Sequence, residues 1–358
     1  MEFGEKLTAL TQSALLPKVV DNVLNSNVLA CRFIGNAMQG KGKYIEKAIK
    51  YENSGAAGSF SGLDSFTASE LDTKTVLTYH MRGVRIPVAV SGMAAVANAV
   101  KETQVTDLVV NSLEESEAEL VDEIGTQIYG DGTGNSDKDL IGIGAIVDDG
   151  TDVDSIGGKS RTDYSVLNAV RTASGGTVSL AKLATLYSAI SSGTAMTAPS
   201  LIVSNETPWD LYEQLLTPSV RENYSMLGYY SVGRTGGATR GDALSGTQGF
   251  VAVSYKGVPW VRDEKATAQN IFMLNEKHID FYGWDAKGVF GYKKIGFTQK
   301  TQEGVYAEAP MSAFTGFNWS GYRAPTNQFA GIADVVLLGN LTSWQPRRQG
   351  RMTGVTGV

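Results

Sequence analysis

The side chains best suited to chemistry are carboxylates in two turn-rich segments, 131–137 and 148–154. In the first, Asp131, Asn135 and Asp137 have the alternate-residue spacing of a calcium-binding loop, but the bidentate glutamate of such a loop is missing. The second contains Asp148, Asp149, Asp152 and Asp154. These groups could coordinate a hard cation or, in pairs, serve a carboxylate-dependent hydrolase. Solvated turn residues are the simpler interpretation, so we expect no metal and no cofactor.

Other catalytic patterns are weak. Residues 157–160 (Gly-Gly-Lys-Ser) resemble the end of a phosphate-binding loop, but the first required glycine would fall at Val153, and an ordinary turn is the simpler interpretation. His80, His278 and Cys31 are the only histidines and the only cysteine, which excludes an intramolecular disulfide and makes a Cys/His zinc site untenable. No Gly-x-Ser-x-Gly motif occurs. The chain is therefore predicted not to be an enzyme.

Composition points to a globular protein. Of the 358 residues, 42% are hydrophobic and 19% are charged. The net charge of −6 argues against a general nucleic-acid binder. No apolar run approaches the roughly 18 residues of a membrane-spanning helix, so we expect no membrane partner and a location in the cytoplasm of the cell that makes the protein.

One long helix, 106–129, is the clearest element. Its apolar residues recur on one helical face: Val109, Leu113, Leu120, Ile124 and Ile128. Acidic residues occupy the rest of its surface: Glu114, Glu115, Glu117, Glu119, Asp122 and Glu123. Because no Lys or Arg occurs between Glu102 and Asp137, this acidic face needs water or basic groups from elsewhere in the chain or from a neighbouring molecule.

The segments before this helix suggest extensions. Residues 1–42 read as an apolar N-terminal arm, and residues 43–90 as a long hairpin whose alternation changes phase at Gly83. The Gly/Ser-rich stretch 53–73 is too long for an unstructured loop within a compact domain unless it has a purpose. We expect it to lie over a neighbouring subunit.

Residues 151–285 read as a compact α/β unit. A helix is predicted around Leu180–Ile190. Strand candidates are Leu201–Ser204, Phe250–Tyr255, Val258–Val261, Ile271–Leu274 and Ile279–Tyr282. The last segment, 286–358, returns to strand-like sequence and ends in a flexible basic tail with Arg347, Arg348 and Arg351. These arginines could contact phosphates or the acidic helix of an adjacent copy, and we favour the protein contact.

Several phrases occur in a recognisable order: LLPKVVDNVLNSN in the arm, YGDGTG after the long helix, PSVRENY at 218–224 and QPRRQGRMTGV near the end. Together with the order of segments, they resemble a tailed-phage major capsid protein of the HK97-like fold. The resemblance implies an α+β fold with five parts: an N-terminal arm (1–42), an E-loop hairpin (43–90), a P-domain with its spine helix (91–150), an α/β A-domain (151–285), and returning P-domain strands with the C-terminal tail (286–358).

What the resemblance implies about function follows the family. Its members assemble rings of five and six subunits into an icosahedral shell around double-stranded DNA, within the host cytoplasm. Partners would be other copies of the chain, a separate scaffolding protein, a portal, non-specifically bound DNA and possible decoration proteins. No cleavage or covalent cross-link is expected. Expected intersubunit contacts are Leu15, Leu16, Val19, Phe60, Leu63, Phe66, Arg221, Arg347, Arg348 and Arg351.

Three alternatives stay open at this point. A nanocompartment shell of the same fold (an encapsulin) would load cargo enzymes in place of DNA. A carboxylate-dependent hydrolase would be active as a monomer and would lose activity on substitution of Asp148 or Asp152. A tail or adhesin protein would show repeats or heptads, and neither is present.

Overall fold

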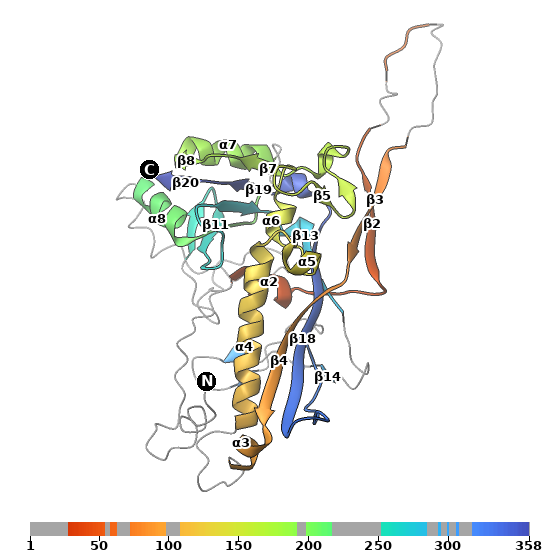
Figure 1. Ribbon diagram of the computed structural model, residues 1–358. Coiled ribbons are helices and arrows are strands. Elements are labelled where there is room, and N and C mark those ends of the chain that lie inside the picture. Colours follow the sequence, from red (N-terminus) through yellow and green to blue (C-terminus); the bar gives the residue numbers. More distant parts are fainter. Residues whose placement is uncertain are drawn as a thin grey trace.

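The computed structural model describes residues 28–53, 58–62, 72–97, 108–191, 198–216, 252–284, 293–294, 299–300, 306–307 and 317–357. It has an elongated body, a broader head at one end of that body, and a thin ribbon that projects from their junction (Figure 1). None of the helices in these segments is long and apolar enough to cross a membrane.

The body is one long helix on a sheet. Helix α4 (Leu108–Tyr129) lies along strands β4 (Arg82–Ser91) and β18 (Ala330–Ser343), which pair antiparallel from Ala330↔Ser91 to Gly339↔Arg82. The sheet has the order β1 (Met38–Gln39), β13 (Ile279–Gly283), β18, β17 (Phe317–Trp319), β14 (Lys293–Lys294), and β4 also pairs with β18. Leu120, Ile124 and Ile128 of α4 are buried in its core, as the helical periodicity predicts.

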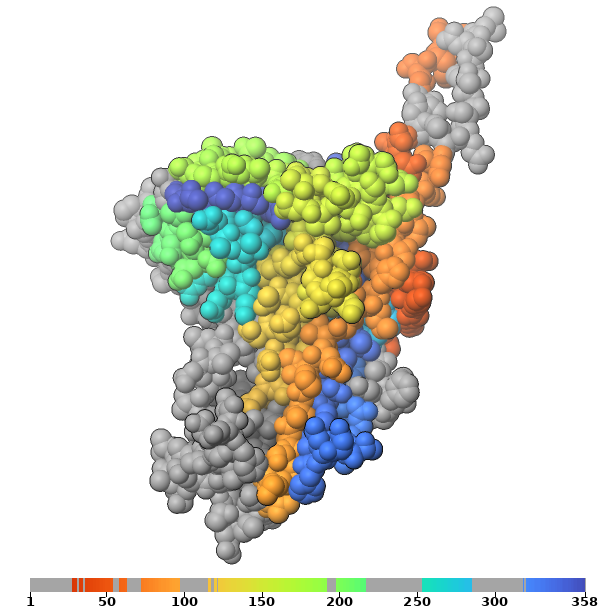
Figure 2. All heavy atoms as spheres, in the orientation of Figure 1, coloured from red at the N-terminus to blue at the C-terminus, as the bar shows by residue number. Residues whose placement is uncertain are grey.

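The projecting ribbon is the predicted hairpin. Strands β2 (Tyr44–Lys50) and β3 (Lys74–His80) pair antiparallel from Tyr44↔His80 to Lys50↔Lys74. Leu77 and Tyr79 are buried on the inner face of β3, and the next strand, β4, buries the opposite parity, so the predicted change of phase is confirmed. Residues 58–62 lie well clear of the body (Figure 2).

The head contains a six-stranded sheet with the order β10-β11-β9-β12-β19-β7. Its strands are β10 (Ala252–Tyr255), β11 (Val258–Arg262), β9 (Leu201–Ser204), β12 (Ile271–Leu274), β19 (Gly350–Met352) and β7 (Val170–Thr172). Helix α7 (Leu180–Ser191) buries Leu183, Leu186 and Ile190 in the second core, to which helix α8 (Glu206–Leu215) contributes Tyr212. Three predicted strands, Leu201–Ser204, Val258–Val261 and Ile271–Leu274, are thus strands of this sheet. So is Ala252–Tyr255, the described part of the candidate Phe250–Tyr255.

The other elements are short, and four of them, β1, β13, β14 and β17, are the strands of the body sheet already named. These short elements are α2 (Val28–Gly35), α3 (Gly92–Ala97), α5 (Gly134–Asp137), α6 (Ile143–Ile146), β1 (Met38–Gln39), β5 (Ser155–Ile156), β6 (Lys159–Ser160), η1 (Ser165–Leu167), β8 (Gly176–Thr177), η4 (Glu276–His278), β13 (Ile279–Gly283), β14 (Lys293–Lys294), β15 (Gln299–Lys300), β16 (Tyr306–Ala307), β17 (Phe317–Trp319), η5 (Pro346–Arg348) and β20 (Val355–Gly357).

Two segments differ from their predicted places: β13 lies in the body sheet and β19 lies in the head sheet. Strand β13, assigned to the α/β unit, pairs with β18 in the body, because the chain crosses from head to body through η4. The end of the chain, expected to be a flexible tail, is ordered: β19 lies between β12 and β7, and β20 pairs with β8. The prediction of a flexible tail was wrong, because main-chain pairing on both sides fixes this strand.

Candidate functional site

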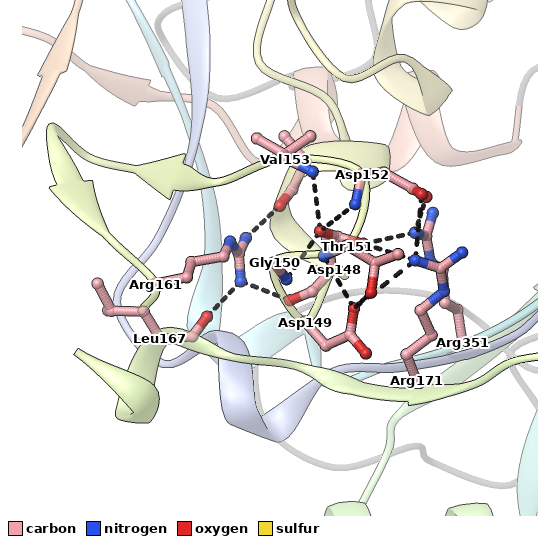
Figure 3. Close-up of polar contacts among 11 residues, drawn as sticks. Asp148, Asp149, Gly150, Thr151, Asp152, Val153, Arg161, Leu167, Arg171 and Arg351 are labelled. Atoms are coloured by element: carbon pink, nitrogen blue, oxygen red, sulfur yellow. Dashed lines mark hydrogen bonds and ion pairs between the residues drawn. The ribbon is translucent and has the colours of Figure 1, made fainter. Parts of the chain in front are cut away.

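The loop that follows α6 forms a dense cluster of polar contacts (Figure 3). The Asp148 side chain is fully buried, and its Oδ2 atom accepts hydrogen bonds from the backbone N–H groups of Gly150 at 2.9 Å, Asp152 at 3.1 Å and Val153 at 3.0 Å. A carboxylate held by several N–H donors is stabilised in its charged form. The loop is therefore wrapped around a buried negative charge.

Two arginines from neighbouring strands supply the opposite charge. Arg171 of β7 and Arg351 of β19 are partners in the parallel register, so both guanidinium groups reach the same side of the sheet. Arg351 Nη2 lies 2.6 Å from Asp148 Oδ1 and also bonds Asp152 Oδ2. Arg171 Nη1 lies 3.1 Å from Asp152 Oδ1 and 3.5 Å from Asp148 Oδ1. The two adjacent cations are tolerated because the carboxylates lie between them.

A third arginine closes the cluster from the other side. Arg161, which is 1% exposed, donates to the backbone carbonyls of Ala145, Asp148 and Leu167. Burial lowers the pKa of its guanidinium group. These three bonds hold the segment around η1 against the loop, so one buried side chain joins three stretches of backbone.

The cluster is connected to the projecting ribbon through a tight turn. Strands β5 and β6 form a hairpin whose two-residue loop is Gly157-Gly158, both with positive φ, so the ordinary-turn interpretation of Gly-Gly-Lys-Ser is confirmed. The carbonyl of Gly157 accepts a hydrogen bond from the N–H of Thr78 at 3.0 Å. A Cβ atom on Gly157 would lie 3.0 Å from Leu77 Cβ. The ribbon thus rests on this glycine.

Most of the carboxylates considered as metal ligands have protein partners. Asp131 Oδ1 accepts from the N–H and hydroxyl of Thr133, and these bonds lower its pKa. Asn135 donates to Asp139, and Asp137 has a positive φ. Asp149 Oδ1 accepts from the N–H and hydroxyl of Thr151.

Asp148 and Asp152 face guanidinium groups, and Asp154 is exposed to solvent. In the part of the chain that the structure describes, no group of three or more His, Cys, Asp or Glu side chains is arranged to hold a metal ion.

The expected intersubunit contacts fall into three groups. Phe60 is 68% exposed, Arg347 is exposed and Arg348 is half-buried. Arg351 differs from the expectation: it is 6% exposed, because its own subunit surrounds and neutralises it. The others lie outside the described residues: Leu15, Leu16, Val19, Leu63, Phe66 and Arg221.

Sequence reasoning missed a second buried carboxylate, Asp263. Its Oδ2 atom accepts from the Tyr129 hydroxyl at 2.8 Å and from the Leu29 N–H at 3.3 Å, and its Oδ1 accepts from the Lys265 N–H at 3.0 Å. Burial raises the pKa of Asp263, and these bonds oppose the rise. This carboxyl group joins the start of α2 to the end of α4. No spacing in the sequence indicates the contact, since its partners lie 134 and 234 positions away.

Comparison with known proteins is informative at the level of structure. No family model and no curated protein matches the sequence. The capsid subunit of cyanophage A-1(L) matches with a TM-score of 0.68 at 13% identity, over 96% of each chain. The capsid of a native GTA particle matches at 0.56 and 8% identity, over 99% of this chain and 97% of that one.

The SrpI encapsulin of Synechococcus elongatus also matches, with a TM-score of 0.53 at 11% identity over 96% of this chain and 92% of that one. These likenesses extend over almost the whole of each chain, and at such low identities they show the fold. The chain therefore has the α+β, HK97-like capsid fold that its sequence predicts.

Proposed function

We propose that this chain is a structural shell subunit: a major capsid protein that self-assembles into pentamers and hexamers of an icosahedral shell enclosing double-stranded DNA. The observation that carries the proposal is the likeness to the cyanophage capsid subunit over 96% of both chains. A likeness of that extent includes body, head and ribbon together, which is the expectation if all three parts serve one assembly.

The ribbon supplies a physical reason to assemble. A two-stranded ribbon is at best marginally stable alone in water. Its outer face carries Tyr44 and Val76, which are 37% and 44% exposed, and Phe60 near its end is 68% exposed. Contact with a neighbouring subunit would bury this apolar surface, at about 25 cal/mol per Å². Many such contacts, each weak, give a stable closed shell through repetition.

The remaining elements of the proposal concern partners and place. The intersubunit contacts are assigned to residues 1–40 and 53–73. A separate scaffolding protein and a portal assist assembly in the host cytoplasm, the DNA is bound non-specifically, and decoration proteins bind the outside of the finished virion capsid. These assignments rest on the resemblance of the sequence to tailed-phage capsid proteins.

Negative-stain electron microscopy tests the proposal directly. The protein should form closed icosahedral shells, or five- and six-fold rings, when expressed alone or with the genes that neighbour its own. A monodisperse monomer under both conditions would contradict it. Deletion of 53–73 should leave a folded monomer that forms no closed shell. If the deletion variant formed shells like those of the wild type, the loop would have no role in assembly.

A second candidate is an encapsulin-like compartment, and the likeness to the SrpI encapsulin favours it. The contents of purified particles discriminate the two. Nuclease-resistant double-stranded DNA in particles made during infection supports the capsid, while a co-purifying cargo enzyme with no nucleic acid supports the compartment.

A further inference from the structure

A group of basic side chains gathers where the ribbon, the body and the head meet. It consists of Lys47 of β2, Lys277 and His278 of η4, and Arg347 and Arg348 of η5, and we name these five residues the basic patch. Lys47, Lys277 and Arg347 are exposed, and the other two are half-buried. The group combines residues from three distant parts of the sequence, so it exists only in the folded subunit.

The basic patch is held rigidly. Buried Gln349 and Asn275 exchange two hydrogen bonds, at 2.7 and 3.0 Å, and thereby fix η5 beside η4. The Tyr79 hydroxyl donates to the Ser343 carbonyl at 2.7 Å, which fixes the ribbon beside the end of β18. Lys47 Nζ lies 5.1 Å from the centre of the Trp344 ring. A preorganised charged surface loses less entropy when a partner binds.

Its charge is predominantly positive. Burial lowers the pKa of His278, and the positive charges of Arg348, Lys277 and Lys47 lower it further, while Asp280 raises it. The other nearby carboxylate, Glu276, binds Arg32 through both oxygens, at 2.7 and 2.6 Å. Around His278, the cations Arg348, Lys277 and Lys47 thus outnumber Asp280, and an excess of positive charge remains.

The chain offers a surface of opposite sign on α4. Glu115, Glu119 and Glu123 are exposed and lie four residues apart, so they form a stripe along the helix with steps of about 6 Å. We name them the acidic stripe. Part of the α4 surface is visible in the middle of the view in Figure 2. Asp122, beside the stripe, pairs with Lys265 at 2.8 Å, which shows that this helix accepts a lysine partner.

We propose that the basic patch of one subunit docks on the acidic stripe of a neighbouring copy. This inference rests on the proposed function and names the contact that the shell would use. It joins unlike surfaces, and a contact between unlike surfaces generates closed rings when the rotation between copies closes. Lys47 belongs to the ribbon that is assigned to intersubunit contact, so the two interfaces are continuous.

DNA phosphates are the competing occupant. The protein carries a net charge of −6, and a few cations alone give weak, salt-sensitive binding to nucleic acid. The acidic stripe is opposite in charge to the basic patch, and every copy of the chain carries both surfaces. These two facts favour the second copy.

A charge-swap cycle tests the docking. Glu119→Lys and Arg347→Glu should each lower the yield of closed shells by at least ~10-fold, the change in association constant for about 1.4 kcal/mol per contact. The double variant should recover most of the wild-type yield, because it restores the pair with reversed signs. Glu206→Lys, the same charge change at a site whose side chain is 65% exposed on α8, should leave the yield unchanged.

Failure to recover the yield, with normal wild-type shells, would overturn the docking while leaving the proposed function intact. Normal empty shells of Arg347→Glu that package less DNA would overturn it too and assign the patch to phosphates. Failure of the wild type to form any shell would instead contradict the proposed function.

Proximity is tested independently by cross-linking. In a Cys31→Ser background, the double variant Glu119→Cys, Arg347→Cys should give a ladder of disulfide-linked species up to hexamers under mild oxidation. Each single variant should give no ladder beyond dimers. The absence of a ladder from the double variant, in shells or in smaller oligomers, would overturn the proposed contact whatever the yield of shells.

Discussion

Arg351 Nη2 lies 2.6 Å from Asp148 Oδ1, although 203 positions separate the two residues in the chain. Both side chains are buried, and the pair joins the last strand of the head sheet to the loop that follows α6. Since Asp148 also binds three backbone N–H groups, it cannot move toward another cation without disrupting its loop. The pair thus sets the position of the loop relative to the sheet.

Arg351→Met should lower the free energy of unfolding by about 3 kcal/mol, because removal of one member of a buried ion pair leaves an uncompensated charge. Arg171 remains near Asp148 and limits the loss. Denaturant unfolding of the unassembled subunit measures the change. Arg262→Met is the matched control: its pair with Glu206 has a similar distance, 2.9 Å, but is exposed, so the cost should be about 0–1 kcal/mol. If Arg351→Met and Arg262→Met lowered the free energy of unfolding equally, the structural role assigned to Asp148 would be wrong.

Gly157→Ala should destabilise the subunit more than Gly158→Ala. Both glycines have positive φ, so an alanine at either carries a backbone cost of about 1–2 kcal/mol. Only at position 157 would the new Cβ also press on Leu77, at 3.0 Å, since position 158 faces open space. Thermal unfolding gives the difference, and hydrogen exchange should show faster opening of β3 in Gly157→Ala alone. Identical exchange in both variants would mean that the ribbon does not rest on the turn.

Tyr79→Phe should lower the free energy of unfolding by about 1–3 kcal/mol, because the buried Ser343 carbonyl loses the hydroxyl that donates to it at 2.7 Å. The ring itself should stay in place, as its edge-to-face contact with Trp344 is unchanged. Calorimetry of the unassembled subunit measures the loss. A phenylalanine variant as stable as the wild type would show that packing alone holds the ribbon.

Asp263 should make stability depend on pH. Its pKa in the folded state is raised above the ordinary 3.8, so the folded protein retains this proton to a higher pH than the unfolded chain. The stability that the protonated carboxyl contributes is fully present below about pH 3.8 and is lost as the pH rises through the raised value. Relative to Asp263→Asn, which does not titrate, the wild type should therefore lose stability across that window and then stay level.

This difference in stability is measured from the unfolding free energies of the wild type and of Asp263→Asn between about pH 3.5 and pH 7. Tyr129, whose own pKa is raised by burial and then by the Asp263 charge, stays neutral throughout the range. A difference that moves in favour of the wild type as the pH rises would mean that the folded protein stabilises the charged carboxylate, which is opposite to the effect expected from burial.

Sequence periodicity was sufficient to predict the helices and strands that are specified by the pattern of their own residues. The long helix is present from Leu108, where the described residues resume, and ends at the predicted Tyr129, while the two residues predicted before Leu108 lie outside the described part of the chain. Leu201–Ser204 and Ile271–Leu274 are strands with the predicted bounds, because each is a short apolar run that is buried on both faces. The acidic face of α4 was also apparent, since no nearby basic residue interrupts it.

Contacts between distant segments were not predictable in the same way. Gly350–Met352 has no apolar run, and it is a strand only because β12 and β7 pair with its two edges. The sequence singled out Asp148 as a possible cation ligand, and the cations beside it are guanidinium groups from strands whose register no local pattern reveals. The sequence therefore identified Asp148 as a side chain that faces cations, but its partners could be identified only from the folded structure.

The place of β19 has a consequence for how the subunit is made. This strand, Gly350–Met352, pairs with β12 and β7, which come much earlier in the chain, so the head sheet cannot be complete until Met352 has been synthesised. At about 5–20 residues per second, synthesis up to Met352 takes tens of seconds. The body sheet is completed only shortly before this point, because its central strand, β18 (Ala330–Ser343), comes just before β19 in the chain. Neither sheet of the nascent chain is complete before Ser343 is made, and the head sheet is complete only at Met352, so a chain that is still shorter lacks folded surfaces that contact with another copy requires.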